Sequence, residues 1–243
     1  MPRLACWITL LLLMNTLASA QPDQRETVVL LHGVAMPALV MHRVARTLEC
    51  EGYRVVNLGY PSRTLPIEQI AADFLPAQLA ARGVAAAPRL HFVTHSMGSL
   101  VLRLYLRDHR PANLGRVVML GPPNHGSRAA DHAAQLAFFR LVAGRNVARR
   151  GTGPQAIAKT LGLADYDLGI IAGNRSNNPL FARWLDAPND GAVAVESARL
   201  EGMKDFIILP YSHTPMLWRS AVLAQISLFL RSGRFLHPAA GLS

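Results

Sequence analysis

The sequence predicts an α/β fold in which a mainly parallel central sheet is covered by helices on both faces. Short apolar runs rich in Val, Ile and Leu alternate with segments whose apolar residues recur at helical spacing. Continuous apolar runs are typical of strands buried on both faces, and helices between such strands imply parallel pairing with right-handed crossovers. The 243 residues contain no recognisable repeat, and we expect a single domain over residues 21–243.

Strands and helices are expected to alternate along most of the chain. The apolar runs predict strands over residues 27–31, 53–58, 90–93, 116–120, 168–172 and 205–209. Helical spacing predicts helices over residues 37–51, 67–82, 97–107, 131–142 and 215–230. Pro76 should kink the second of these helices, because proline has no N–H and its ring clashes with the preceding turn. Residues 189–195 are expected to form a turn that runs into an extended segment.

Residues 127–166 interrupt this alternation and allow two interpretations. Their apolar side chains could form a cap or lid over a site, or could belong to a plain core helix. The apolar residues concerned are Ala133, Leu136, Phe138, Phe139, Leu141 and Val142.

The first twenty residues have the composition of a secretory signal peptide. Arg3 precedes a short apolar run, and Ala18-Ser19-Ala20 forms a cleavage site of the A-x-A type. We therefore expect a secreted or periplasmic protein that starts after Ala20. Cys6 would leave with this segment, so Cys50 would remain alone, without a disulfide and with a buried, inert thiol.

The formal net charge of +10 comes mainly from arginines that are spread along the chain. No Lys/Arg stripe with interleaved aromatic residues is present, so we expect no nucleic-acid partner. The basic surface leaves peripheral contact with an anionic membrane open. Nothing in the sequence suggests a metal or another cofactor, and the oligomeric state stays open.

The segment Leu90 to Arg107 carries the most informative motif. An apolar strand leads into Thr94-His95-Ser96-Met97-Gly98, and a helical pattern follows. A serine at a sharp strand-to-helix turn is the arrangement of a nucleophile elbow, in which the hydroxyl is exposed and the helix N-terminus points at it. The alternative is an ordinary helix N-cap serine. Thr94 and Ser99 depart from the glycines common in this motif.

A serine nucleophile requires a histidine base and an acid that orients the histidine. His213 lies in a loop after the last predicted strand, whereas His237 lies in the C-terminal tail, and His125 and His132 follow the serine too soon. Asp190, between Asn189 and Gly191, suits a carboxylate at a strand end, although an Asp-Gly turn is an equally good explanation. The other candidate acids between the serine and His213 are Asp131, Asp165, Asp167, Asp186, Glu196, Glu201 and Asp205.

An ester-cleaving site also requires backbone N–H groups that bind the developing oxyanion. One N–H is expected from Met97, directly after the serine. The other is expected from Val34, in the loop after the first strand, because Gly33 lets the backbone of that loop approach the serine closely. A simple turn at the end of the first strand would give the same His32-Gly33 sequence.

Five motifs together resemble the secreted bacterial lipase and esterase branch of the α/β-hydrolase superfamily, with the nearest likeness to class 2, lipase A-like enzymes. They are L-L-H-G-V, T-H-S-M-G, G-P-P-N-H-G-S, N-D-G-A-V-A-V-E-S-A-R-L and P-Y-S-H-T. The resemblance spans residues 28 to about 230 and implies the α/β-hydrolase fold. It implies a catalytic triad of Ser96, Asp190 and His213, an oxyanion hole of Val34 and Met97, and a substrate site lined by His32, Gly33, His95, Asn124 and His125.

The sequence therefore predicts a serine hydrolase that cleaves carboxylic esters, either soluble or lipid, through an acyl-serine. A lid over residues 127–166, with its apolar surface facing the acyl chain, would favour a lipase acting at interfaces, whereas its absence would favour an esterase for short, soluble acyl chains. The same triad could instead serve an acyltransferase or a thioesterase. An alternative of another class is a non-catalytic binding module, against which the complete Ser, Asp and His set argues.

Overall fold

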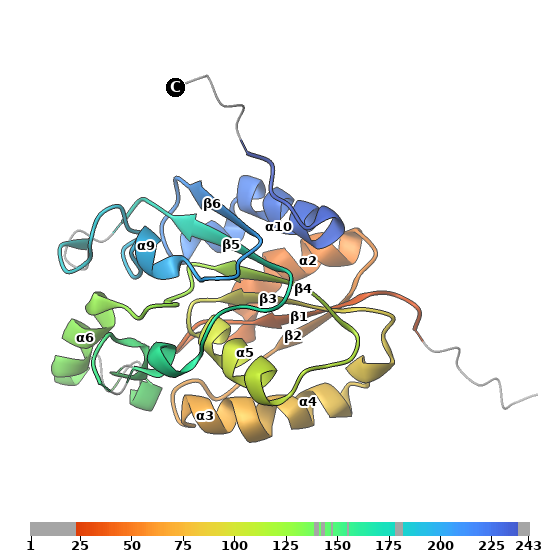
Figure 1. Ribbon diagram of the computed structural model, residues 1–243, viewed down its shortest axis with the longest axis horizontal. Coiled ribbons are helices and arrows are strands. Elements are labelled where there is room, and N and C mark those ends of the chain that lie inside the picture. The colour runs from red at the N-terminus through yellow and green to blue at the C-terminus, as the bar shows by residue number, and fades with distance from the viewer. Residues whose placement is uncertain are drawn as a thin grey trace, which may run out of the picture.

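The described part of the chain forms a six-stranded sheet in the order β2-β1-β3-β4-β5-β6, and all neighbouring strands are parallel (Figure 1). The computed structural model describes residues 23–138, 141, 144–146, 148–154, 156–177 and 182–237. The predicted signal peptide lies outside these residues. The strands are β1 (Thr27–Leu31), β2 (Arg54–Leu58), β3 (Leu90–His95), β4 (Leu114–Leu120), β5 (Leu168–Gly173) and β6 (Asp205–Leu209).

Helices cover both faces of the sheet. On one face lie α2 (His42–Cys50) and α10 (Ser220–Ser232), and on the other lie α5 (Met97–Asp108), α3 (Ile67–Gln69) and α4 (Leu75–Ala81) (Figure 1). The remaining helical segments are α6 (Arg128–Gln135), α9 (Val195–Ala198) and the short segments η1 (Ala38–Met41), η2 (Ile70–Phe74), η3 (Val84–Ala86), η4 (Gly144–Asn146), η5 (Ala148–Arg150), η6 (Ile157–Thr160) and η7 (Pro215–Trp218).

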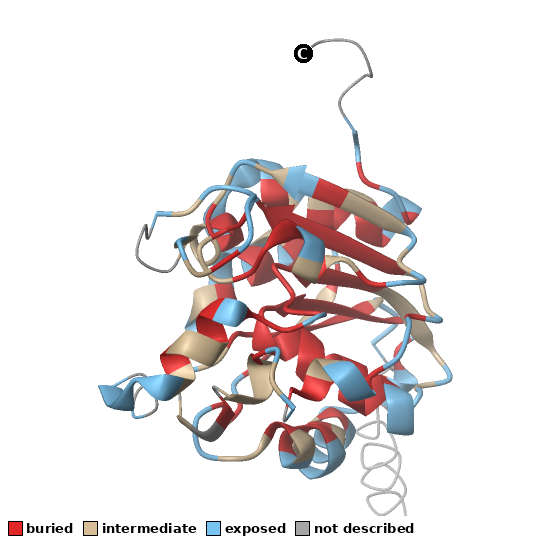
Figure 2. Cartoon of the chain, turned by 60° about the vertical axis from the view of Figure 1, so that its left-hand side comes forward, coloured by how far each residue is buried: buried red, intermediate tan, exposed pale blue. Residues whose placement is uncertain are grey.

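The two cores follow directly from strand geometry. Successive side chains of a strand point to opposite faces, so Val29 and Leu31 of β1 pack with α5, whereas Val28 and Leu30 pack with α2 and α10. The strands are therefore buried throughout their centre (Figure 2). This explains why their sequences are continuously apolar rather than alternating.

The strand predictions are confirmed to within about two residues, but several other details differ. Residues 189–195 do not form a strand: Asn189 and Ala194 make one isolated bridge, and Val195 begins the helix α9. Pro76 is accommodated by the π-helical turn η2, whose wider spacing relieves the missing N–H of the proline. Cys50 is exposed rather than buried, because it is the last residue of α2.

The predicted helix at residues 131–142 begins earlier, at Arg128, and α6 ends at Gln135. Ser127 caps this helix by accepting a hydrogen bond from the N–H of Ala130. Within the described part of the chain, no helix combines the length and the apolar character needed to cross a membrane.

Parallel pairing places the carboxyl ends of all six strands at one edge of the sheet. Leu31 lies opposite Thr94, and His95 lies opposite Leu120. The loops that follow β1, β3, β5 and β6 therefore meet at this edge, and they contain Val34, Ser96, Asp190 and His213. Such an edge is where α/β sheets place their ligand sites.

Gly98 allows α5 to cross closely over β1. A β-carbon there would lie 2.6 Å from the carbonyl oxygen of Leu31 and 2.7 Å from that of His32. Both atoms belong to the backbone and cannot rotate away. We expect Gly98→Ala to lower the free energy of unfolding by about 1–3 kcal/mol, as measured by urea denaturation.

Gly59→Ala is the matched control, because a β-carbon there meets only the side chain of Ala38, at 3.7 Å. It should change the free energy of unfolding by less than about 0.5 kcal/mol. Equal stability of the two variants would contradict the close crossing.

Candidate active site

Ser96 occupies the sharp turn between β3 and α5. Its backbone φ is +53° and its ψ is −122°, a conformation that residues other than glycine rarely adopt. The Ser96 N–H donates to the carbonyl of Leu120 at 3.0 Å, and the Ser96 carbonyl accepts from Ser99 N–H at 3.0 Å. These contacts on both sides hold the strained turn in place, as is usual at functional sites.

The two departures from the glycine-rich motif contact each other beneath this turn. The hydroxyls of Thr94 and Ser99 lie 2.8 Å apart, and both side chains are fully buried. Each hydroxyl therefore satisfies the other in a place where water cannot reach.

Ser96, His213 and Asp190 form one hydrogen-bonded line across three loops. Nε2 of His213 lies 2.9 Å from Oγ of Ser96, and Nδ1 of His213 lies 2.7 Å from Oδ2 of Asp190. The carboxylate accepts from Nδ1–H, so Nε2 is left as the acceptor for the serine hydroxyl. This arrangement can remove a proton from the serine.

Backbone N–H groups hold Asp190 in addition to its contact with the His213 ring. Its Oδ1 accepts from the N–H groups of Ala192 at 2.9 Å and Val193 at 2.7 Å, and the carboxylate is buried. His213 N–H also donates to the Asp190 carbonyl at 3.0 Å. Asp186, the neighbouring alternative, instead pairs with Arg128 at the surface.

The loop after β1 passes beside Ser96. A β-carbon at Gly33 would lie 3.3 Å from Cβ of Ser96 and 3.0 Å from Nδ1 of His95. Among the described residues, the N–H groups of Val34 and Met97 find no acceptor. Two unpaired donors near one hydroxyl are what an oxyanion site requires.

The structure places His95 and His32 behind the site rather than on its surface. Both rings are buried, so neither is positioned for the substrate contact expected from the sequence. Nε2 of His95 donates to the His213 carbonyl at 3.1 Å, and the two rings lie 4.7 Å apart. Burial, and then the neighbouring His213, hold the pKa of His95 well below its ordinary value.

His32 is held by Tyr60, a residue that carried no sequence signal. The two rings stack at 4.1 Å, and the Tyr60 hydroxyl donates to the His32 carbonyl. Tyr60 N–H donates to Nε2 of His32, so the ring proton of His32 must be on Nδ1. That Nδ1–H donates to the carbonyl of Gly33 at 2.7 Å. Burial lowers the pKa of His32.

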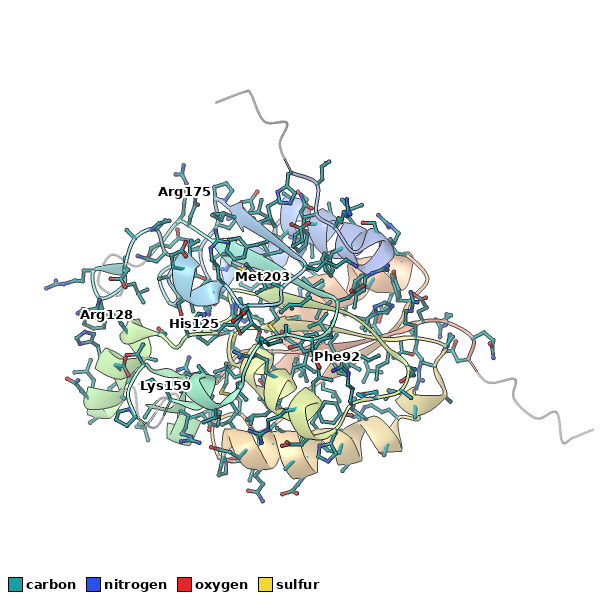
Figure 3. All side chains as sticks on the ribbon, viewed as in Figure 1. Phe92, His125, Arg128, Lys159, Arg175 and Met203 are labelled. Atoms are coloured by element: carbon teal, nitrogen blue, oxygen red, sulfur yellow. The ribbon has the colours of Figure 1, made fainter. Side chains whose placement is uncertain are left out.

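Asn124 and His125, expected at the substrate site, differ in position. Asn124 is buried, and its amide donates to the Ala198 carbonyl at 2.8 Å. The guanidinium of Arg103, a buried residue of α5, donates to both oxygens of Asn124 at 3.1 Å. His125 is exposed and lies toward the side of the molecule that carries α6 (Figure 3). The asparagine therefore anchors the loop, and neither residue forms a described hydrogen bond with the serine.

An open hollow of about 470 Å³ lies beside His213. Its wall is mostly apolar, and Asp190 is the one ionisable group besides His213 among its described residues. The lining residues are Met36, Ser176, Asn177, Asp190, Gly191, Ala192, Ser212, His213, Thr214 and Pro215. Ser96 itself is only 3% exposed.

Nowhere in the described ranges do three His, Cys, Asp or Glu side chains gather as metal ligands would.

Buried neutral histidines make the stability of the fold dependent on pH. Burial lowers the pKa of His32, His91 and His95 in the folded protein, whereas the unfolded chain takes up protons near the ordinary value of 6.5. The free energy of unfolding should therefore be greatest above pH 6.5 and fall as the pH drops below it. The expected slope is up to ~1.4 kcal/mol per pH unit for each ring that stays neutral.

Urea denaturation at about pH 7.5 and pH 5.5 measures this slope. His95→Asn should make the slope shallower, and His125→Gln, an exposed control, should leave it unchanged. A wild-type protein that is equally stable at both pH values would contradict the expectation.

The chain matches no known sequence family and no curated protein. It is similar to solved structures over most of its length. Mature lipase BlEst2 of Bacillus licheniformis is 18% identical, with a TM-score of 0.64 over 88% of this chain and 93% of that chain. Esterase Pf2001 of Pyrococcus furiosus is 17% identical, with a TM-score of 0.58 over 87% and 84%. Lipase B of Aspergillus fumigatus is 15% identical, with a TM-score of 0.62 over 88% and 55%.

At these identities the likeness concerns the fold. The parallel sheet, the helices on both its faces and the structural neighbours agree with the prediction made from the five motifs. The chain has the α/β-hydrolase fold.

Proposed function

We propose that the protein is a serine hydrolase that cleaves carboxylic esters through an acyl-serine intermediate. The observation that carries this proposal is the line from Ser96 through His213 to Asp190, with hydrogen-bond distances of 2.9 and 2.7 Å. The lipases and esterases among the structural neighbours support an ester as the substrate class.

The proposed reaction has two halves. Ser96 Oγ attacks the ester carbonyl while Nε2 of His213 accepts the hydroxyl proton, and the tetrahedral oxyanion collapses as the protonated histidine gives that proton to the departing alcohol. Water then attacks the acyl-serine, again losing a proton to His213, and the acid leaves as Ser96 regains its proton. Asp190 stabilises the imidazolium in both halves.

The oxyanion would be bound by the N–H groups of Val34 and Met97. Met97 is the first residue of α5, so its N–H belongs to the positive end of the helix dipole. Preformed donors of this kind are effective because they require no reorganisation when the charge develops.

The hollow beside His213 favours an uncharged substrate group. Its wall offers Met36, Ala192 and Pro215 as apolar contacts, and Ser176 and Asn177 as polar ones. The described part of the wall carries no arginine or lysine that would bind an anionic group. We propose neutral acyl esters as the substrate class.

Replacing the serine tests the reaction directly. Ser96→Ala removes the attacking oxygen, so turnover of a chromogenic p-nitrophenyl ester should fall on the order of 10⁶-fold. A fluorophosphonate probe should label the wild-type protein on the peptide that contains Ser96 and leave the variant unlabelled.

The control is Ser227→Ala in α10, whose buried hydroxyl has no partner in the described residues, so both readouts should stay unchanged. Hydrolysis that persists in Ser96→Ala would refute the proposal.

We further propose that the segment 127–166 contacts lipid interfaces. It exposes Leu136, Phe138 and Leu141 at 44%, 66% and 73% of their surface, and exposed large apolar side chains suit a binding surface. Arg63, which donates to the Leu141 carbonyl, is exposed beside them and suits an anionic lipid surface.

Leu141→Asp should reduce hydrolysis of an emulsified long-chain ester at least about fivefold, because the introduced charge opposes insertion into lipid. Hydrolysis of a soluble short-chain ester should stay within about twofold of wild type. Equal losses on both substrates would indicate a structural defect and count against the interface.

A further inference from the structure

We propose that Asn146 and Ser62 are positioning residues, which hold the loop at residues 32–37 so that the Val34 N–H faces the acyl group on Ser96. Neither residue contacts the reacting atoms, and neither belongs to a motif in the sequence. The inference rests on the proposed function. It means that Asn146, within the segment 127–166, supports the oxyanion site as well as any contact of that segment with substrate.

Asn146 is fully buried, and all of its side-chain polar atoms contact the loop that follows β2. Its Nδ2 donates to the carbonyls of Ser62 at 2.9 Å and Leu65 at 2.8 Å. Its Oδ1 accepts from the N–H of Ile67 at 2.9 Å, which is the first residue of α3. A buried amide with every group satisfied fixes its partners more firmly than a surface contact does.

Ser62, held by Asn146, in turn contacts the loop after β1. Its buried hydroxyl accepts from the N–H of Ala35 at 3.0 Å. Ala35 has a φ of +57°, an unfavourable conformation for a residue with a β-carbon, so the loop needs a partner to keep it. Val34 directly precedes Ala35, and its N–H direction depends on that backbone.

A second set of contacts joins the same two segments. Gly144 has a φ of +70°, and a β-carbon there would overlap the carbonyl oxygen of Arg63. The guanidinium of Arg63 donates to the Leu141 carbonyl at 3.0 Å. Arg149 forms an ion pair with Glu68. The described residues Leu141, Gly144 and Arg149 therefore contact the same loop and the start of α3, beside Asn146.

The chemical consequence concerns the transition state more than substrate binding. Oxyanion donors work when they lie about 2.7–3.1 Å from the developing charge. A misplacement of about 1 Å can cost on the order of 100-fold in rate. Because the contact forms only in the transition state, its loss should lower kcat and leave KM nearly unchanged.

The test compares Asn146→Ala and Ser62→Ala with the wild-type protein on a soluble p-nitrophenyl ester. Both variants should lower kcat about 10- to 100-fold and keep KM within about twofold. Ser62→Thr retains the hydroxyl and should recover most of kcat. Hydrogen exchange should be faster in the peptide that contains residues 33–36 in both alanine variants.

Two matched controls separate positioning from general stability. Asn113→Ala removes an amide that likewise donates to two carbonyls, those of Val84 and Ala87, at the other end of the sheet. Ser227→Ala removes a buried hydroxyl without a described partner. Both should keep kcat within about twofold and leave exchange of residues 33–36 unchanged.

The outcomes distinguish this inference from the proposed function. If the wild-type protein hydrolyses no ester, the proposed function fails, and the exchange measurement alone decides whether Asn146 and Ser62 hold the loop. Unchanged kcat in both alanine variants of an active enzyme overturns the inference, and so does unchanged exchange of residues 33–36. If Asn146→Ala fails to fold, Ser62→Ala, which removes a single oxygen atom, carries the same test.

Discussion

The backbone reversal at Ser96 is the constraint on which the site depends. A positive φ at a residue with a β-carbon is unfavourable by itself, so the surrounding structure must hold it. Leu120 of β4 supplies a carbonyl on one side, and the first turn of α5 supplies an N–H on the other. Gly98 lets α5 lie against the carbonyls at the end of β1. The reversal therefore requires three neighbouring strands in their native register.

Sequence patterns predicted the sheet well because its inner strands β1, β3 and β5 are buried on both faces and need nearly continuous apolar runs. They favoured Asp190 among the acids between the serine and the histidine, but an ordinary Asp-Gly turn explained that sequence equally well. Folding separates Asp190 from Asp186, as Asp186 pairs with Arg128 and Asp190 lies 2.7 Å from Nδ1 of His213. The burial of His95 could not be predicted from local sequence either, because its hydrogen-bond partner is the carbonyl of His213, 118 positions away.

The segment 127–166 is tied to the body of the protein by buried polar groups. Asn146 contacts the loop after β2, and the guanidinium of Arg103 donates to the Gly162 carbonyl at 2.7 Å as well as to Asn124. Burial lowers the pKa of Arg103. The hydrogen-bond partners of its guanidinium among the described residues are uncharged carbonyl and amide oxygens. Breaking these contacts would leave buried polar groups without partners, which is costly, so these points should stay attached.

The hydroxyl pair of Thr94 and Ser99 has an evolutionary consequence. Replacing Thr94 alone with the glycine usual in such elbows would leave the Ser99 hydroxyl in a dry interior without its partner. Changing Ser99 alone to a residue without a hydroxyl would likewise leave the Thr94 hydroxyl without its partner. Since the double exchange removes both hydroxyls and leaves neither unpaired, its cost should be less than the sum of the two single costs, and the two positions should be energetically coupled. Directed evolution toward a glycine-rich elbow would then have to cross a fitness valley or mutate both codons together.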